Sequence, residues 1–322
     1  PMAMAPTAST SRTDMAALGR VISLVRGRQP GEATAASAAI GDPVARKLAE
    51  WVILRSENNG ATVERYRDFI ASNSGWPSLD FIRAEAALWD DRRDDGAVLA
   101  WFQKETPLSA KGRLVLARAA LNRGDRRTAE RLVRETWRED SLSAAMERAV
   151  LDQFGGMLTS ADHKARMDSL LYRDSEREAA WRAAQRLGGA QQALAKARLA
   201  VSRRAANAKA LLDAVPHALR SDPGYIFSRV QWLRRNDHLA EAARLLQTAP
   251  REPARLYDLD EWWIERRVMV REMLDIGDPR SAYLIARDAA VPSRSNYRTQ
   301  HQFTAGWVAL RFLHDPATAT RH

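Results

Sequence analysis

Three stretches decide the fold of this chain: residues 123–133 (RGDRRTAERLV), residues 235–246 (RNDHLAEAARLL) and residues 276–286 (IGDPRSAYLIA). In each stretch one helix is expected to end, a residue that tolerates left-handed backbone angles follows, and an acidic residue opens the next helix. An alanine then stands five residues after the left-handed position: Ala129 after Gly124, Ala242 after Asp237, and Ala282 after Gly277. Such a small side chain lets two antiparallel helices approach closely, so each stretch predicts a helix hairpin.

This arrangement resembles the turn between the two helices of a tetratricopeptide-type (TPR) repeat, although the spacing of the three copies is irregular. A helix pair of this kind has an apolar face that it cannot bury alone, so neighbouring pairs stack. The sequence contains no convincing run of alternating β-branched residues with hairpin turns. We therefore expect an all-α fold, a right-handed superhelix of antiparallel helix pairs that forms a TPR-like α-solenoid arc.

The two ends of the chain differ in composition. Residues 1–40 are rich in Ala, Ser, Thr, Pro and Gly, and we expect a flexible leader there with one short helix over residues 15–25 (MAALGRVISLV). From Asp42 onward, helical segments alternate with short breaks. This pattern predicts one α-superhelical domain over residues 41–322.

The overall composition supports helices and limits the partners. Only 16 glycines and 13 prolines occur in 322 residues, which is few for a many-stranded β fold. The formal net charge of +10 indicates either a solvated arginine-rich surface, which we favour, or attraction to a polyanion. No run of five or more basic residues occurs, which argues against a nucleic-acid partner. No stretch of 18 apolar residues occurs, so we expect no membrane span.

The sequence predicts no catalytic residue, metal site or cofactor. It has no cysteine, and none of its six histidines lies in an HExxH motif or at a metal-ligand spacing from a nearby carboxylate. The nucleotide motifs GxGxxG and GxxxxGK[ST] and the nucleophile motif GxSxG are also absent.

Two aromatic segments are the candidates for ligand contact. Residues 260–267 (DEWWIERR) contain adjacent tryptophans, which point about 100° apart on a helix and cannot share one face. We favour packing as their role, and we expect a tightly packed helix over residues 306–313 (GWVALRFL). The functional alternative is stacking on sugar rings, with arginines that hold carboxylates. The candidate substrate contacts are then Trp263, Arg266, Arg267 and Arg311.

Short packing motifs follow one another in a fixed order from about residue 60 to the end. They are Ser74-Gly75-Trp76-Pro77-Ser78, Arg83-Ala84-Glu85, Gly124-Asp125 with Ala129, Leu132-Val133-Arg134, Trp137-Arg138, Glu147, Phe154-Gly155, Leu158-Thr159, Asp162-His163, Arg166, Asp168, Leu170-Leu171-Tyr172, Arg229, Trp232-Leu233-Arg234-Arg235, Ala249-Pro250, residues 262–267, Ala282-Tyr283 and residues 306–313. In order and approximate spacing, this set resembles the long helical N-terminal region of soluble lytic transglycosylases of the α-proteobacterial type.

The resemblance implies a rigid arc of antiparallel helices that a linker region closes into a ring and that carries a lysozyme-like catalytic domain. The whole enzyme would cleave the MurNAc–GlcNAc bond of peptidoglycan with a single glutamate and leave a 1,6-anhydro end, without a metal or nucleotide. The resemblance also implies a periplasmic location. The implied partners are glycan strands and the protein's own linker and catalytic domain.

This chain departs from the family where the chemistry would lie. The catalytic domain would carry a Glu-Ser pair and a Gly-Leu-Met-Gln stretch, and neither occurs here. We therefore expect an inactive fragment of a longer protein that is a lyase only as a whole. The alternative is a free-standing TPR-like scaffold that binds a protein or peptide on its concave face.

Overall fold

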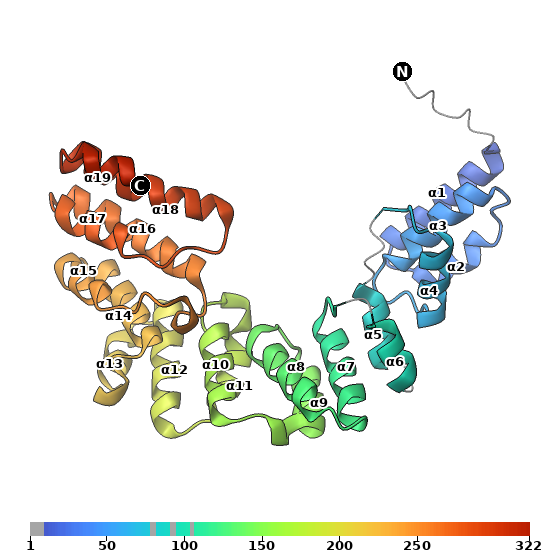
Figure 1. Ribbon diagram of the computed structural model, residues 1–322, viewed down its shortest axis with the longest axis horizontal. Helices are drawn as coiled ribbons and strands as arrows, with labels where there is room; N and C mark the ends of the chain where they lie inside the picture. The colour runs from blue at the N-terminus through green and yellow to red at the C-terminus, as the bar shows by residue number, and fades with distance from the viewer. Residues whose placement is uncertain (1–9, 78–81, 91–94, 104–105) are drawn as a thin grey trace. The chain divides into compact units, whose positions relative to one another are not determined.

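The computed structural model describes residues 10–77, 82–90, 95–103 and 106–322 (Figure 1). Residues 1–9 of the expected leader and Ser78 of the first family motif lie outside these ranges. Across the described ranges all regular structure is helical and no strand is found, which confirms the all-α prediction. Contacts group the chain into two compact units, one up to Thr136 and one from Trp137 to His322, with the boundary inside α8 (Arg126–Glu139).

The first unit contains the seven helices that precede α8 in the described ranges. They are α1 (Arg12–Arg26), α2 (Pro30–Ser37), α3 (Pro43–Leu54), α4 (Val63–Ser72), α5 (Ile82–Asp90), α6 (Asp95–Trp101) and α7 (Ala110–Asn122). α1, α2 and α3 pack on one another, α4 packs on α5, and both α5 and α6 pack on α7, with small apolar clusters in the spaces between them.

Residues 12–37 form two helices, whereas the sequence predicted one short helix in a flexible leader. The expected helix over residues 15–25 lies inside α1 and is confirmed. The segment that follows it is α2, which packs against α1 and α3. Val21, Ala33 and Ile40 are fully buried between these helices. An alanine-rich composition hides this packing, because alanine buries little area but allows helices to lie close together.

The three predicted hairpin turns are confirmed. The backbone φ is +84° at Gly124, +61° at Asp237 and +78° at Gly277. In each turn the next residue donates its N–H to a carbonyl five residues before it, at 2.8–3.0 Å, as in a Schellman motif: Asp125 to Ala120, His238 to Leu233, and Asp278 to Met273. The alanines at residues 129, 242 and 282 are all fully buried.

The second unit continues with helix pairs. Its helices after α8 are α9 (Ala144–Phe154), α10 (Ser160–Leu170), α11 (Arg177–Ala184), α12 (Gly189–Ser202), α13 (Ala208–Asp213), α14 (Pro223–Arg235), α15 (Leu239–Gln247), α16 (Leu259–Asp275), α17 (Pro279–Arg287), α18 (Ser295–Phe312) and α19 (Pro316–Arg321). Short 3₁₀ turns lie at η1 (Gly155–Met157), η2 (Asp174–Glu176), η3 (His217–Leu219) and η4 (Pro253–Arg255).

Each pair from α10/α11 to α18/α19 packs internally, and the first helices of successive pairs form a row in which α12 contacts α14, α14 contacts α16, and α16 contacts α18 (Figure 1). The largest apolar cluster runs through the last three pairs and includes Val230, Leu246, Trp262, Ile285 and Val308. None of the helices in the described ranges is both long and apolar enough to cross a membrane.

Candidate functional site

The two tryptophans of α16 both lie inside the second unit. Trp263 is fully buried, and its ring lies 5.1 Å from the ring of His301 on α18. Trp262 is 2% exposed, and its indole N–H donates to the hydroxyl of Tyr172 at 3.0 Å. Because no face of Trp263 reaches the surface, its candidate role in stacking on a sugar ring is wrong for this structure. The packing interpretation holds for both residues.

Arg266 is also buried, which corrects its candidate role as a substrate contact. Its guanidinium donates to the carbonyl of Ile285 on α17 at 3.0 Å and to that of Leu246 on α15 at 3.3 Å. Burial lowers the pKa of Arg266 to about 10, so the group stays charged at neutral pH. These two hydrogen bonds link α16 to α17 and to α15.

The other two candidate contacts lie nearer the surface and are not brought together with this pair. Arg267 donates to the side-chain oxygen of Gln300 on α18 at 2.7 Å, and its guanidinium lies 5.8 Å from the ring of Tyr297. Arg311 is exposed on α18. The four candidates therefore do not form one binding surface.

A buried ionic cluster joins α9, α10 and α11. Arg166 has no exposed surface, and it donates to Glu147 at 2.8 Å and to the carbonyls of Trp137 and Asp140 at 2.7 and 3.0 Å. The second oxygen of Glu147 accepts from Arg182 at 2.6 Å. Glu147 is thus held by two arginines from two helices.

A second ionic cluster joins α10, α12 and the start of α14. The buried carboxylate of Asp168 accepts from Arg198 at 2.7 Å and from Lys164 at 2.6 Å, and Lys164 also bonds Asp222 at 2.8 Å. Burial alone would lower the pKa of Lys164, but the two carboxylates raise it above its ordinary value. Asp222 caps α14, so this cluster fixes one helix pair to the next.

A cleft of about 510 Å³ lies between α11, α12 and α13, and it is the best candidate for ligand contact. Trp181 lines it, with the ammonium of Lys196 5.5 Å from the ring centre. The lining also includes two apolar side chains, Leu199 and Leu211, and the basic side chain of Arg203. An aromatic ring can stack on a sugar, and the cations beside it can bind a carboxylate.

Trp181 is not among the contacts predicted from the sequence, although its neighbours in the sequence indicate its position. The alanines at residues 179, 180, 183 and 184 are all buried and mark the packed face of α11. Trp181 is only partly buried at the edge of that face. The alanine face of α11 was therefore the available signal, because Trp181 stands beside that face on the helix.

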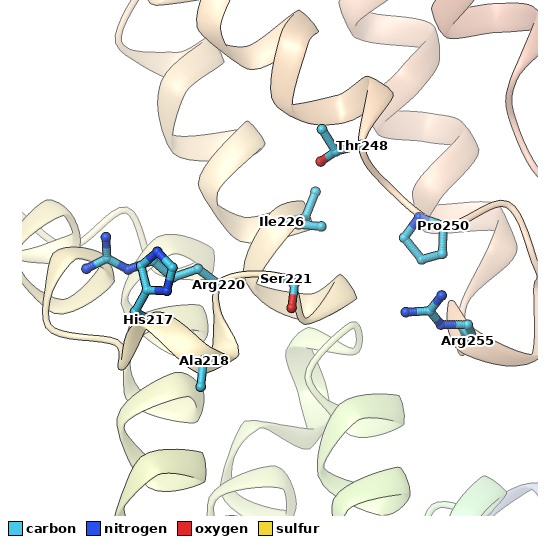
Figure 2. A pocket seen from close by; sticks show the side chains of 8 residues that line it. All are labelled: His217, Ala218, Arg220, Ser221, Ile226, Thr248, Pro250 and Arg255. Atoms are coloured by element: carbon cyan, nitrogen blue, oxygen red, sulfur yellow. The ribbon is translucent and has the colours of Figure 1, made fainter.

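A further cleft of about 520 Å³ lies between η3 and η4 (Figure 2). His217 and Arg220 lie on one side and Arg255 on the other. The guanidinium of Arg220 donates to the carbonyl of Asp213 at 2.8 Å, and the Thr248 hydroxyl donates to that of Leu245 at 2.7 Å. The cleft is basic, but its lining contains no Trp, Tyr or Phe side chain, so it offers less to a sugar than the cleft at Trp181.

The described part of the chain contains no group of three or more His, Asp or Glu residues that could hold a metal ion. Comparison of the chain with models of protein families, with curated proteins and with solved structures finds no match.

Proposed function

We propose that this chain is the helical scaffold arm of a peptidoglycan lytic transglycosylase. The arm positions glycan or the catalytic domain of a periplasmic enzyme that cleaves the MurNAc–GlcNAc bond and leaves 1,6-anhydro ends. In this proposal the helix pairs continue one another as a right-handed TPR-like superhelix, and the chain itself performs no chemistry. The order of the sequence motifs is the basis for naming the family.

The observation that carries the proposal is a set of buried ion pairs between neighbouring helices. Glu147, Asp168 and Glu265 are each buried and bonded to arginines from neighbouring helices. Removing one partner of such a pair leaves an uncompensated charge and costs about 3–5 kcal/mol. Groups committed in this way hold helices in register, which is what a rigid arm requires, and they do not act as acids or bases.

The cleft at Trp181 supports contact with glycan. Peptidoglycan strands present pyranose faces and carboxylates, and the cleft combines a ring with the cations of Lys196 and Arg203. Two of the four contacts suspected from the sequence, Trp263 and Arg266, are enclosed and do not compete for this role.

Purified peptidoglycan sacculi test both parts of the proposal. The chain should sediment with sacculi and release no 1,6-anhydro products, and Trp181→Ala should lower the bound fraction about tenfold. Ala190→Ser is a matched surface control that should bind as the wild type. Release of anhydro products by this chain alone, or no binding at all, contradicts the proposal. Sequencing the parent reading frame gives a second test, because a Glu-Ser motif is expected after residue 322.

A free-standing interaction scaffold of TPR-like helix pairs is the second candidate. One observation favours it: large apolar side chains are exposed on α18. It predicts a protein ligand and no retention on sacculi.

A further inference from the structure

Another cleft, of about 630 Å³, lies between the C-terminal ends of α12 and α14 and the turn that leads into α13. We call it the Arg204 cleft. A volume of this size is typical of sites for small organic molecules. Four basic side chains and no carboxylate are among the residues that line it, which are Val201, Arg204, Ala205, Ala206, Ala208, Lys209, Trp232, Arg234, Arg235 and Asn236. This lining favours an anion.

Two of the four basic side chains have carboxylate partners outside the cleft. The ammonium of Lys209 bonds Asp213 at 2.7 Å. The guanidinium of Arg234 donates to the two oxygens of Glu265 at 2.7 and 3.2 Å. Because their charges are balanced by these carboxylates, the two side chains add little net charge to the cleft.

The other two basic side chains, Arg204 and Arg235, form no ion pair with a carboxylate in the part of the chain that the structure describes. Both residues bond the same oxygen. The carbonyl of Val201 accepts the backbone N–H of Arg204 at 3.1 Å and the guanidinium of Arg235 at 2.8 Å. This shared acceptor holds two unpaired arginines from different segments beside each other. One bond to a carbonyl uses one of the five N–H donors of Arg235, which leaves the others for a ligand.

The cleft keeps a positive charge after the local dipoles are counted. Partial burial lowers the pKa of Arg235, and the positive charges of Arg234 and Arg204 lower it further, while the carboxylate of Glu265 opposes them. The carbonyl ends of α12 and α14 together carry a partial negative charge of about one unit. They offset only part of the charge of two unpaired arginines, so a bound anion would remove a repulsion that the free cleft contains.

A phosphate monoester matches this arrangement better than a carboxylate does. It carries a charge of about −1.5 to −2 at pH 7 and three acceptor oxygens, so it can neutralise two arginines and accept from both. The planar fork of each guanidinium binds phosphate oxygens in pairs. Space for the organic group attached to the phosphate lies along the uncharged part of the lining, which includes Ala205, Ala206, Ala208 and Trp232.

We infer that the Arg204 cleft binds the phosphate group of a small phosphorylated molecule, with Arg204 and Arg235 as the donors to the phosphate oxygens. This inference goes beyond the peptidoglycan proposal, because it concerns a different cleft and a different class of ligand. It holds for an enzyme arm and for a free-standing scaffold alike.

Isothermal titration calorimetry of the whole chain with three related sugars tests the inference. Glucose 6-phosphate, glucuronate and glucose share a ring and differ in one group, which is a phosphate, a carboxylate or a hydroxyl. Glucose 6-phosphate should bind, glucuronate should bind about tenfold more weakly, and glucose should not bind. Arg204→Gln and Arg235→Gln should each weaken the binding of glucose 6-phosphate by about tenfold, because each removes a charged donor.

Arg203→Gln is the matched control. Arg203 and Arg204 are consecutive in the α12–α13 turn, but Arg203 lines the cleft at Trp181 and Arg204 lines the Arg204 cleft. Arg203→Gln makes the same charge change and should bind glucose 6-phosphate as the wild type does. On sacculi the peptidoglycan proposal expects the reverse, with weaker retention of Arg203→Gln and unchanged retention of Arg204→Gln.

Four outcomes overturn the inference. The first is no binding of glucose 6-phosphate or of inorganic phosphate. The second is equal binding of glucuronate and glucose 6-phosphate, which assigns the cleft to carboxylates. The third is an equal loss in Arg203→Gln and Arg204→Gln, which assigns the attraction to the net charge of the chain. The fourth is sedimentation with phosphatidylglycerol vesicles that Arg204→Gln abolishes and glucose 6-phosphate does not compete for, which assigns the cleft to lipid headgroups. None of these readouts involves sacculi, so the inference and the peptidoglycan proposal can fail separately.

Discussion

The helices α16 and α18 are neighbours of almost equal length, 17 and 18 residues, yet Trp263 and Trp307 differ in their exposure to solvent. The sequence favoured packing for Trp263 of α16, with contact to a sugar as the alternative, and this residue is fully buried. It predicted a tightly packed helix around Trp307 of α18, and this residue is 41% exposed. α16 has helices on both sides of the row and α18 on one. The exposure of a tryptophan in such a stack therefore depends on its neighbours more than on its own helix.

The largest expected difference between the two helices is the cost of losing the tryptophan. Trp263→Ala removes a fully buried ring and should lower the free energy of unfolding by about 3–5 kcal/mol. Trp307→Ala removes a partly exposed ring at an uncovered face and should cost about 1 kcal/mol or less. Urea unfolding followed by circular dichroism measures both. Equal losses would mean that the Trp307 side of α18 is covered in solution.

The next contrast concerns charge. Glu265 on α16 is 3% exposed and accepts from Arg234 at 2.7 Å, so Glu265→Gln leaves that guanidinium without its carboxylate. The expected loss of stability is about 3 kcal/mol. The double variant Glu265→Leu, Arg234→Met should recover much of it, because it removes both charges. On α18, the exposed Arg311→Met should change stability by less than about 0.5 kcal/mol. A double variant no better than the single one would show that the pair does not act as a unit.

The turns that follow the two helices sharpen the comparison further. Gly277 after α16 has φ +78°, so Gly277→Ala should cost about 1 kcal/mol. His314 after α18 has φ +54°, which a residue with a β-carbon adopts only at a cost. His314→Gly should therefore stabilise the unit by up to about 1 kcal/mol. Thermal unfolding of both variants decides the matter, and shifts in the same direction would contradict this account.

The turns also show how far the sequence could predict the fold. Gly124, Asp237 and Gly277 could be recognised because glycine and aspartate tolerate a left-handed backbone. The turn at Arg28 between α1 and α2, with φ +59°, could not, because arginine gives no such signal. Ala33 stands five residues later and is fully buried, as in the predicted turns. Local chemistry therefore found three hairpins whose turn residue is typical and missed others, among them those at Arg28, Arg204 and His314, in which packing imposes the conformation.

The candidate site was harder to predict, for a different reason. Periodicity assigns a residue to a face of its own helix, and it does not say whether another helix covers that face. From the sequence alone, Arg266 is expected to be a charged surface residue. In the structure its guanidinium is buried and donates to carbonyls near the ends of α15 and α17. Trp181 was overlooked because its cleft forms only when α12 and α13 pack beside it. Burial and clefts are properties of helix pairs in contact.

The smallest expected effect lies at the contact between the two helices. His301 of α18 is buried against the ring of Trp263, and one of its ring nitrogens lies 3.0 Å from the carbonyl of Ala286. Burial lowers the pKa of His301, and the positive charges of His322 and Arg266 lower it further, while the hydrogen bond to Ala286 opposes them.

The unfolded chain therefore binds a proton on His301 more readily than the folded chain does. Stability from this group is present above the unfolded pKa of about 6.5 and is lost as the pH falls from there toward the lower folded pKa. The wild type should lose stability between pH 7.5 and 5.5, and His301→Gln, which keeps a donor for the carbonyl but cannot titrate, should lose less over that range. His163 has a lowered pKa as well, but it is present in both proteins and cancels in the difference. Parallel pH profiles of urea unfolding for the two proteins would mean that the α16–α18 contact opens enough to solvate the imidazole.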